Sequence, residues 1–305
     1  CHDLSAAERE QVVAYVEGFN AADSREVSSI WLRSSDKETG QAEGAQRVCG
    51  GYSQILNYFL GVGNDGPLDV RKQRQVHTIR WKPGAVEVET IGPAIHEAFS
   101  ARTAIVALPL GVLQISPQQA GGVRFEPDLS AQRQLWMELR MGPVVKLLLL
   151  FREPFWETHV EEELAFLHTP NAPFVAWWST LPAKSPMLTG WAGGPRAMRL
   201  SQFDDSQILR AGIRQLAENF QLRTCDLDER LVAHRVCNWQ TDTFSRGAYA
   251  YVPPGGTAWL EALRKPVENT LFFAGEATHQ QLMGTVQGAI ASGWRAAEEI
   301  LADSS

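Results

Sequence analysis

The sequence has few cysteines and no long apolar run. Its four cysteines, at positions 1, 49, 225 and 237, show no Cys-x-x-Cys spacing and no accompanying histidine cluster, so we expect neither a metal site nor a redox dithiol. The longest apolar stretch, residues 144–151, contains Lys146 and is far shorter than the ~18–20 residues of a membrane span. We therefore expect no membrane partner. Scattered cysteines point toward a reducing compartment such as the cytoplasm without assigning one.

Positive charge is also in deficit. The 28 Lys and Arg residues against 35 Asp and Glu residues give a net charge of −7, and no run of five like charges occurs. This balance gives no electrostatic reason to bind nucleic acid, whereas small cationic molecules are mildly favoured. The sequence also lacks the motifs of zinc peptidases, P-loop proteins and serine hydrolases, which excludes those function classes as first hypotheses.

What is present is an ordinary globular composition, with 44% hydrophobic and 21% charged residues among 305. Helical and strand periodicities both occur, which predicts an α/β (α+β) fold. Ser5 and Glu8 form a capping box that begins a helix ending near Gly18. Further helices are expected near residues 27–32, 52–60, 129–140 and 206–222, a hairpin at 76–90, and strands near 98–108, 144–151, 166–167, 174–180 and 187–192.

The most informative stretch is residues 269–301. The apolar run Leu271–Ala274 is typical of a strand buried on both faces, and it stops at Gly275. From Thr285 the apolar positions recur at three and four, which predicts a helix of about four turns. A strand, a turn and a helix rich in small residues present backbone N–H groups to an anionic or electron-rich ligand. The alternative is that the small residues only allow tight packing of the helix on the sheet.

This stretch, NTLFFAGEATHQQLMGTVQGAIASGWRAAEEIL, resembles the C-terminal flavin-binding signature of the flavin-containing amine oxidase family. Three further stretches resemble the same family in its order and roughly at its spacing. They are TAIVALPLGVL at 103–113, MGPVVKLLLLFREPFW at 141–156, and NWQTDTFSRGAYAYVPPGG at 238–256. The four ordered matches cover most of the chain and are much more specific than any one of them.

The resemblance implies FAD as the cofactor. It implies that Trp239 packs on the isoalloxazine ring, that Thr285 lines it, and that Gly275 and Val286 lie near the pyrophosphate and the pyrimidine. It also places Glu276 in the cofactor site, where the alternative is a carboxylate that supports the turn. The cofactor-binding residues implied in this way are Val76, Pro109, Trp239, Gly275, Glu276, Thr285 and Val286. For Val76 and Trp239 the alternative is ordinary strand packing.

The resemblance implies Lys146 and Tyr249 as the catalytic residues. In the family, the lysine of this motif lies near the reactive flavin nitrogen and holds a water, which implies the same role for Lys146. The alternative is that Lys146 lies on an edge strand and that its charged end reaches solvent. Tyr249 would lie by the reactive side of the flavin, where an aromatic face attracts a cationic amine. Ala248 stands where monoamine oxidases carry the flavin-linked cysteine, which implies that FAD is held non-covalently.

Three tryptophans and the region before the last helix bear on the aromatic lining of a substrate cavity. Trp177, Trp178 and Trp191 are candidates for it, and burial in the core is the alternative for each. Leu282 and Thr285 stand in the region where several members of the family carry an aromatic of the substrate cage. A complete cage of two aromatic residues is therefore not predicted.

The family's first signature, a strand followed by a Gly-x-Gly-x-x-Gly turn and a helix, does not occur in the 305 residues. Glycines 61, 63 and 66 follow no apolar strand and begin no helix. We expect a chain that begins after its dinucleotide-binding unit, and that is completed by a homo-oligomer or by a partner. The expected divisions are 1–44 (helical, substrate side), 45–112 (FAD side, with the hairpin), 113–237 (mixed-sheet substrate domain) and 238–305 (C-terminal FAD-binding segment).

The function implied by the resemblance is FAD-dependent oxidation of a small-molecule amine. A hydride would pass from an amine C–H to the flavin, with O2 as the final acceptor, although this chain alone would be inactive without the N-terminal unit. One alternative is a flavin desaturase or porphyrinogen-type oxidase that acts on a large apolar substrate. Another is a catalytically silent domain that needs a partner chain.

Overall fold

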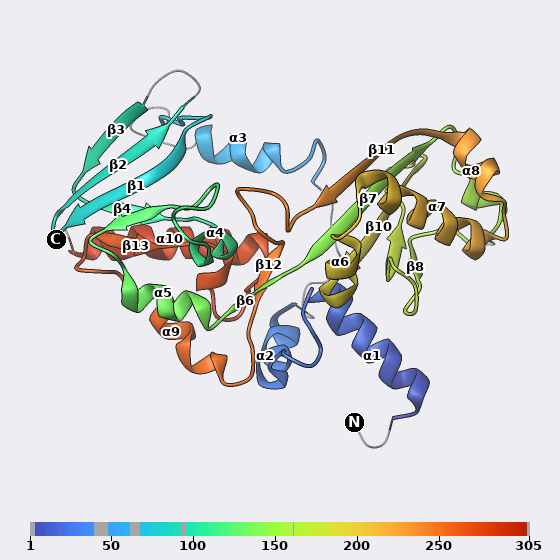
Figure 1. Ribbon diagram of the computed structural model, residues 1–305, viewed down its shortest axis with the longest axis horizontal. Helices are drawn as coiled ribbons and strands as arrows, with labels where there is room; N and C mark the ends of the chain where they lie inside the picture. The colour runs from blue at the N-terminus through green and yellow to red at the C-terminus, as the bar shows by residue number, and fades with distance from the viewer. Residues whose placement is uncertain (1–3, 40–47, 62–67, 93–95, 161, 304–305) are drawn as a thin grey trace.

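A computed structural model describes residues 4–39, 48–61, 68–92, 96–160 and 162–303. Two sheet-containing halves lie side by side, and α1 and α2 lie below the junction between them in the view of Figure 1. Within the described ranges, no helix is both long and apolar enough to cross a membrane.

The helices cover both halves of the molecule. The α-helices are α1 Ala6–Phe19, α2 Ser29–Thr39, α3 Ser53–Gly61, α4 Leu110–Gln114, α5 Ser130–Met137, α6 Gly194–Leu200, α7 Asp205–Phe220, α8 Thr224–Arg230, α9 Leu260–Leu263 and α10 Val286–Asp303, and the 3-10 helices are η1 Phe155–Thr158, η2 Gly256–Trp259 and η3 Glu276–Thr278. The capping box of Ser5 and Glu8 begins α1 as expected, with both reciprocal hydrogen bonds present.

The described strands form four sheets. They are β1 Gln75–Lys82, β2 Ala85–Ile91, β3 His96–Ala101, β4 Ala104–Val106, β5 Arg124–Glu126, β6 Arg140–Gly142, β7 Val144–Phe151, β8 Phe166–His168, β9 Ala176–Trp178, β10 Met187–Gly193, β11 Leu231–Asn238, β12 Tyr249–Tyr251 and β13 Leu271–Phe273. The expected strand at 98–108 is two strands, because β3 pairs antiparallel with β2 whereas β4 pairs parallel with β13.

The first half contains a five-stranded antiparallel sheet in the order β11-β7-β10-β9-β8. Alternate residues of β7, from Val145 to Phe151, are buried in a core that they share with Ile208, Ile213 and Leu216 of α7. The other face of β7 carries Lys146 and is only half-buried. This face, turned away from α7, is the one that lies toward the functional site.

The second half contains a four-stranded sheet in the order β3-β2-β1-β5 and the parallel pair β4–β13. Phe272 of β13 packs in a small buried cluster with Ala296 of α10. Phe273 points to the opposite face and joins the main core of this half, which we call the second core. A short pair, β12–β6, connects this half to the five-stranded sheet, since β6 leads into β7. The mixed α/β fold expected from the sequence is therefore confirmed.

Candidate functional site

A cavity of about 920 Å³ lies between the five-stranded sheet, α1, α2 and the loop before α10. One wall is formed by aromatic residues on three adjacent strands: Phe166 of β8, Trp178 of β9 and Trp191 of β10. Their rings form a continuous surface, with centroids 6.1 Å apart for Phe166 and Trp178 and 5.8 Å apart for Trp178 and Trp191. Trp177, on the opposite face of β9, is fully buried in the core.

The floor of the cavity is formed by residues from the last two motif segments, 238–256 and 269–301. Tyr249 and Ala250 of β12 meet Gly284 and Thr285, which lie just before α10. Glu276 joins the two segments, because its carboxylate accepts the backbone N–H of Ala250 at 3.0 Å and the N–H of Gly284 at 2.7 Å. Burial raises the pKa of Glu276, and these two hydrogen bonds oppose that rise.

Tyr249 also connects the floor to α1. Its hydroxyl donates a hydrogen bond to the Phe19 carbonyl, and the Trp191 indole N–H donates to the Gly18 carbonyl at 2.8 Å. The last carbonyls of a helix lack intrahelical partners, so the two cavity residues satisfy the end of α1. Burial, followed by the nearby Glu276 carboxylate, raises the pKa of Tyr249, so its hydroxyl remains protonated at neutral pH.

The start of α10 has the geometry of a site for an electron-rich group. The Thr285 hydroxyl accepts the N–H of Gly288 at 3.0 Å and so caps the helix. Among the described residues, no hydrogen-bond acceptor is found for the N–H groups of Val286 and Gln287. A Cβ on Gly288 would lie 2.1 Å from the Leu282 carbonyl oxygen, so only glycine permits this approach of loop and helix.

Gly275, at the end of β13, leaves open space beside the backbone. Its φ is +115°, and an added Cβ would meet only the Leu108 carbonyl oxygen, at 3.9 Å. A ligand can therefore lie against this turn, which fits a large cofactor. The N–H of Gly275, however, already donates to the Ser292 hydroxyl at 2.9 Å, so this group is not available to a phosphate.

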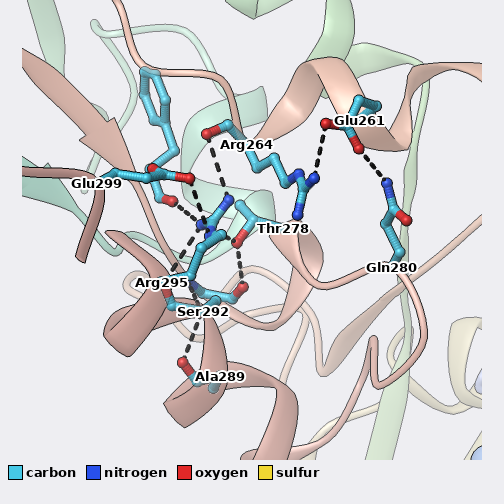
Figure 2. A network of polar contacts seen from close by, with 10 residues as sticks. Glu261, Arg264, Thr278, Gln280, Ala289, Ser292, Arg295 and Glu299 are labelled. Carbon is cyan, nitrogen blue, oxygen red and sulfur yellow. Dashed lines mark hydrogen bonds and ion pairs between the residues drawn. The ribbon is translucent and has the colours of Figure 1, made fainter. Parts of the chain in front are cut away.

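A polar network behind the floor holds this turn against α10 (Figure 2). The Arg295 guanidinium donates to the Phe273 carbonyl and to the Thr278 hydroxyl, and so spans the turn that carries Glu276. The Ser292 hydroxyl in turn donates to the Ala289 carbonyl at 2.6 Å. These hydrogen bonds from Arg295 and Ser292 favour one backbone conformation of the turn.

Lys146 lies in the interior of the five-stranded sheet, so the edge-strand alternative does not apply. β7 pairs with β10 on one side and with β11 on the other, and Lys146 stands opposite Trp191 and Cys237. Its Nζ lies 5.9 Å from the centroid of the Trp178 ring. Lys146 is therefore on the cavity face of the sheet, although it is not among the residues that line the cavity itself.

The remaining candidate residues lie outside the lining of the cavity. Trp239 follows β11 and is partly exposed, and its N–H donates to the Val144 carbonyl at 3.1 Å. Val76 on β1 packs against the second core, and Pro109 precedes the first turn of α4. Gly63 and Gly66, and the expected division between residues 44 and 45, lie outside the described residues. The structure thus brings Tyr249 and Thr285 together at the cavity, with Glu276 behind them.

The sequence placed residues 1–44 on the substrate side, but it singled out no residue of α1 or α2 as part of the cavity lining. Tyr15 and Phe19 of α1 line the cavity, and their rings stack with centroids 5.3 Å apart; Trp31 of α2 lines the cavity as well. One signal was present, because α1 carries apolar residues on more than one face. Several apolar side chains that lie together on the exposed side of a helix often mark a binding surface.

Comparison with known proteins establishes the family. Residues 1–301 match the model of the flavin containing amine oxidoreductases, and the chain belongs to this family. It is 30% identical over 294 residues to polyamine oxidase 2 of Arabidopsis thaliana, covering 94% of this chain and 54% of that protein. It is 28% identical over 260 residues to human lysine-specific histone demethylase 2, covering 83% of this chain and 30% of the other.

Solved structures share the fold. A putrescine oxidase double mutant matches with a TM-score of 0.77 at 18% identity, and cyclohexylamine oxidase from Brevibacterium oxydans IH-35A matches with 0.73 at 23% identity. Each match covers 98% of this chain and 65% of the other. The chain thus spans less than two thirds of the length of these relatives.

Proposed function

We propose that this chain is the substrate-binding part and the C-terminal FAD-binding part of an oxidase of small-molecule amines. The observation that carries the proposal is the floor of the cavity. There the Glu276 carboxylate accepts the N–H groups of Ala250 and Gly284, and so holds the segment with Tyr249 next to the segment with Thr285. In this proposal residues 1–44 and 113–237 bind the substrate, and residues 45–112 and 238–305 bind FAD.

FAD, when bound, supplies the acceptor for the hydride that leaves the amine carbon, and passes the electrons to O2. The start of α10 would hold the pyrimidine edge of the ring through the N–H groups of Val286 and Gln287. Thr285 and Trp239 would lie along the ring, and the open backbone at Gly275 would face the pyrophosphate. Val76 and Pro109 would contact the adenosine side.

The side chains of the cavity would act on the substrate. The aromatic wall excludes water and holds the carbon skeleton of the amine. The Tyr249 hydroxyl stays protonated and keeps α1 closed over the floor. Lys146 brings a positive charge to the same face of the sheet, where it would hold a water molecule and favour electron density on the ring.

The test is flavin binding followed by reduction. The purified chain is mixed with FAD, desalted, and its visible absorption is recorded before and after an amine is added without oxygen. Retained colour that bleaches with the amine, and returns with peroxide when air is admitted, supports the proposal. Flavin that is retained but bleached by no amine would instead favour the desaturase-type alternative. Loss of all flavin on desalting would favour the other alternative, a catalytically silent domain that needs a partner chain.

Attachment of the flavin can be tested separately. Ala248 has no group that could bond to the flavin, so acid precipitation is expected to leave all flavin in the supernatant. The matched variant is Ala248→Cys, which places a thiol at the same backbone position. Flavin that stays with the precipitated wild-type protein would contradict non-covalent binding.

A further inference from the structure

The cavity has an unusual lining for a site that is proposed to bind amines. Of the described residues that line it, none is Asp, Glu, Lys or Arg. The polar side chains are uncharged amides and hydroxyls, such as Gln11, Asn20 and Thr285, together with His168 near the rim. The rest of the wall is aromatic or aliphatic.

Two carboxylates near the cavity, Glu17 and Glu276, have other partners among the described residues. Glu17 of α1 pairs with Arg196 of α6 at 2.6 Å, and it also accepts the Ser24 hydroxyl at 2.9 Å. Glu276 directs its oxygens to the backbone N–H groups of Ala250 and Gly284. Neither carboxylate is among the residues that line the cavity, so neither offers a direct ion pair to a bound cation.

Positive charge is already present on this side of the sheet. The Lys146 ammonium lies over the Trp178 ring, 5.9 Å from its centroid, and so already supplies a cation to one aromatic side chain of the wall. The first N–H groups of α10 add a partial positive charge at the floor. A second ammonium group on a ligand would therefore lose its hydration without gaining a counter-ion, which strongly disfavours binding.

We propose that the cavity selects amines that carry one basic nitrogen on a bulky apolar group, and that it excludes diamines and polyamines. This inference rests on the proposed function for the position of the reacting nitrogen. The apolar group would lie against Phe166, Trp178 and Trp191, where burial of its surface favours binding. Tyr15 and Phe19, which are 54% and 55% exposed, form an apolar rim through which it enters.

The first experiment compares two ligands of equal length. Heptylamine and 1,6-diaminohexane differ only by a methyl group in place of the distal ammonium, and binding is followed by the fluorescence of the cavity tryptophans with and without FAD. We expect heptylamine to bind about 100-fold more tightly, because only the diamine must bury an unpaired charge. Equal binding, tighter binding of the diamine, or binding of neither overturns the proposal.

A second experiment adds the missing charge. Gln11→Glu replaces a lining amide by a carboxylate of the same shape, and it should narrow the preference for heptylamine by about tenfold. The matched control is Gln134→Glu on α5, which makes the same change of net charge at an exposed position outside the cavity and should leave the preference unchanged. An unchanged preference in Gln11→Glu, or an equal change in the control, contradicts the proposal.

The binding assay separates this inference from the proposed function. If the chain binds heptylamine selectively but its flavin is not reduced, the proposed oxidase function is refuted and the proposed ligand preference is supported. If the chain oxidises both amines equally well, the proposed oxidase function is supported and the proposed ligand preference is refuted.

Discussion

The two halves of the molecule differ in how completely their apolar surfaces are covered. In the five-stranded half, alternate residues of β7 and the facing residues of α7 are fully buried. In the other half the β4–β13 pair has two strands, Ile105 is 41% exposed, and α10 exposes Trp294 at 63% and Leu301 at 68%. The strands of the first half are covered by α7, whereas the second half has a core but leaves apolar side chains of β4 and α10 exposed.

The largest expected effect is on the complete core. Leu147→Ala removes a fully buried side chain and should lower the free energy of unfolding by about 2–5 kcal/mol. Ile105→Ala, in the two-stranded pair, should lower it by less than about 1 kcal/mol, since much of that side chain is already in contact with solvent. Urea unfolding of both variants measures the difference, and equal losses would contradict the contrast between the halves.

The next largest effect is expected at Glu276, which accepts two hydrogen bonds at the floor of the cavity. Glu276→Ala removes the acceptor of two backbone N–H groups and should cost about 1–3 kcal/mol, because those groups lose their partner inside the protein. Hydrogen exchange should quicken at Ala250 and Gly284, while the amides of β7 remain protected. Uniform quickening throughout both halves would mean that Glu276 supports the whole fold rather than the floor.

A smaller effect concerns pH. Burial raises the pKa of Glu276 in the folded state, so the folded protein holds this proton at a pH where the unfolded chain has released it. Stability from this group is present below the ordinary glutamate pKa and declines as pH rises through the folded pKa. The stability of wild type relative to Glu276→Gln should therefore fall as pH rises above the ordinary glutamate pKa of about 4. Denaturant midpoints measure it, and a rising difference would contradict the sign.

The smallest effect is expected at the surface of the four-stranded sheet. Arg80 forms ion pairs with Glu87, Glu89 and Glu126, and all four side chains are substantially exposed. Exposed pairs contribute little, so Arg80→Ala should change the free energy of unfolding by less than about 1 kcal/mol, and less still in high salt. Thermal unfolding at low and high salt checks this, and a loss comparable to that of Leu147→Ala would show that this surface cluster contributes as much to stability as a buried core side chain.

Local periodicity was enough to predict much of the fold. The capping box at Ser5, the hairpin of β1 and β2, the strand β7 and the helix α7 all lie where the pattern placed them, because each depends on residues close together in the chain. The division between β3 and β4 was missed, since it depends on two different partner strands. The motif segments around Tyr249 and Gly284 were predicted to converge through the family resemblance alone.

The sequence by itself determined the family, through four ordered motifs, and the places of several helices and strands, through periods set by backbone geometry. Only the tertiary structure decided that Lys146 lies inside a sheet, that α1 and α2 form a cavity wall, and that the cavity lining is uncharged within the described residues. The reason is physical. A period indicates which side chains share a face, but which face meets a ligand depends on contacts between residues as distant as Phe19 and Tyr249.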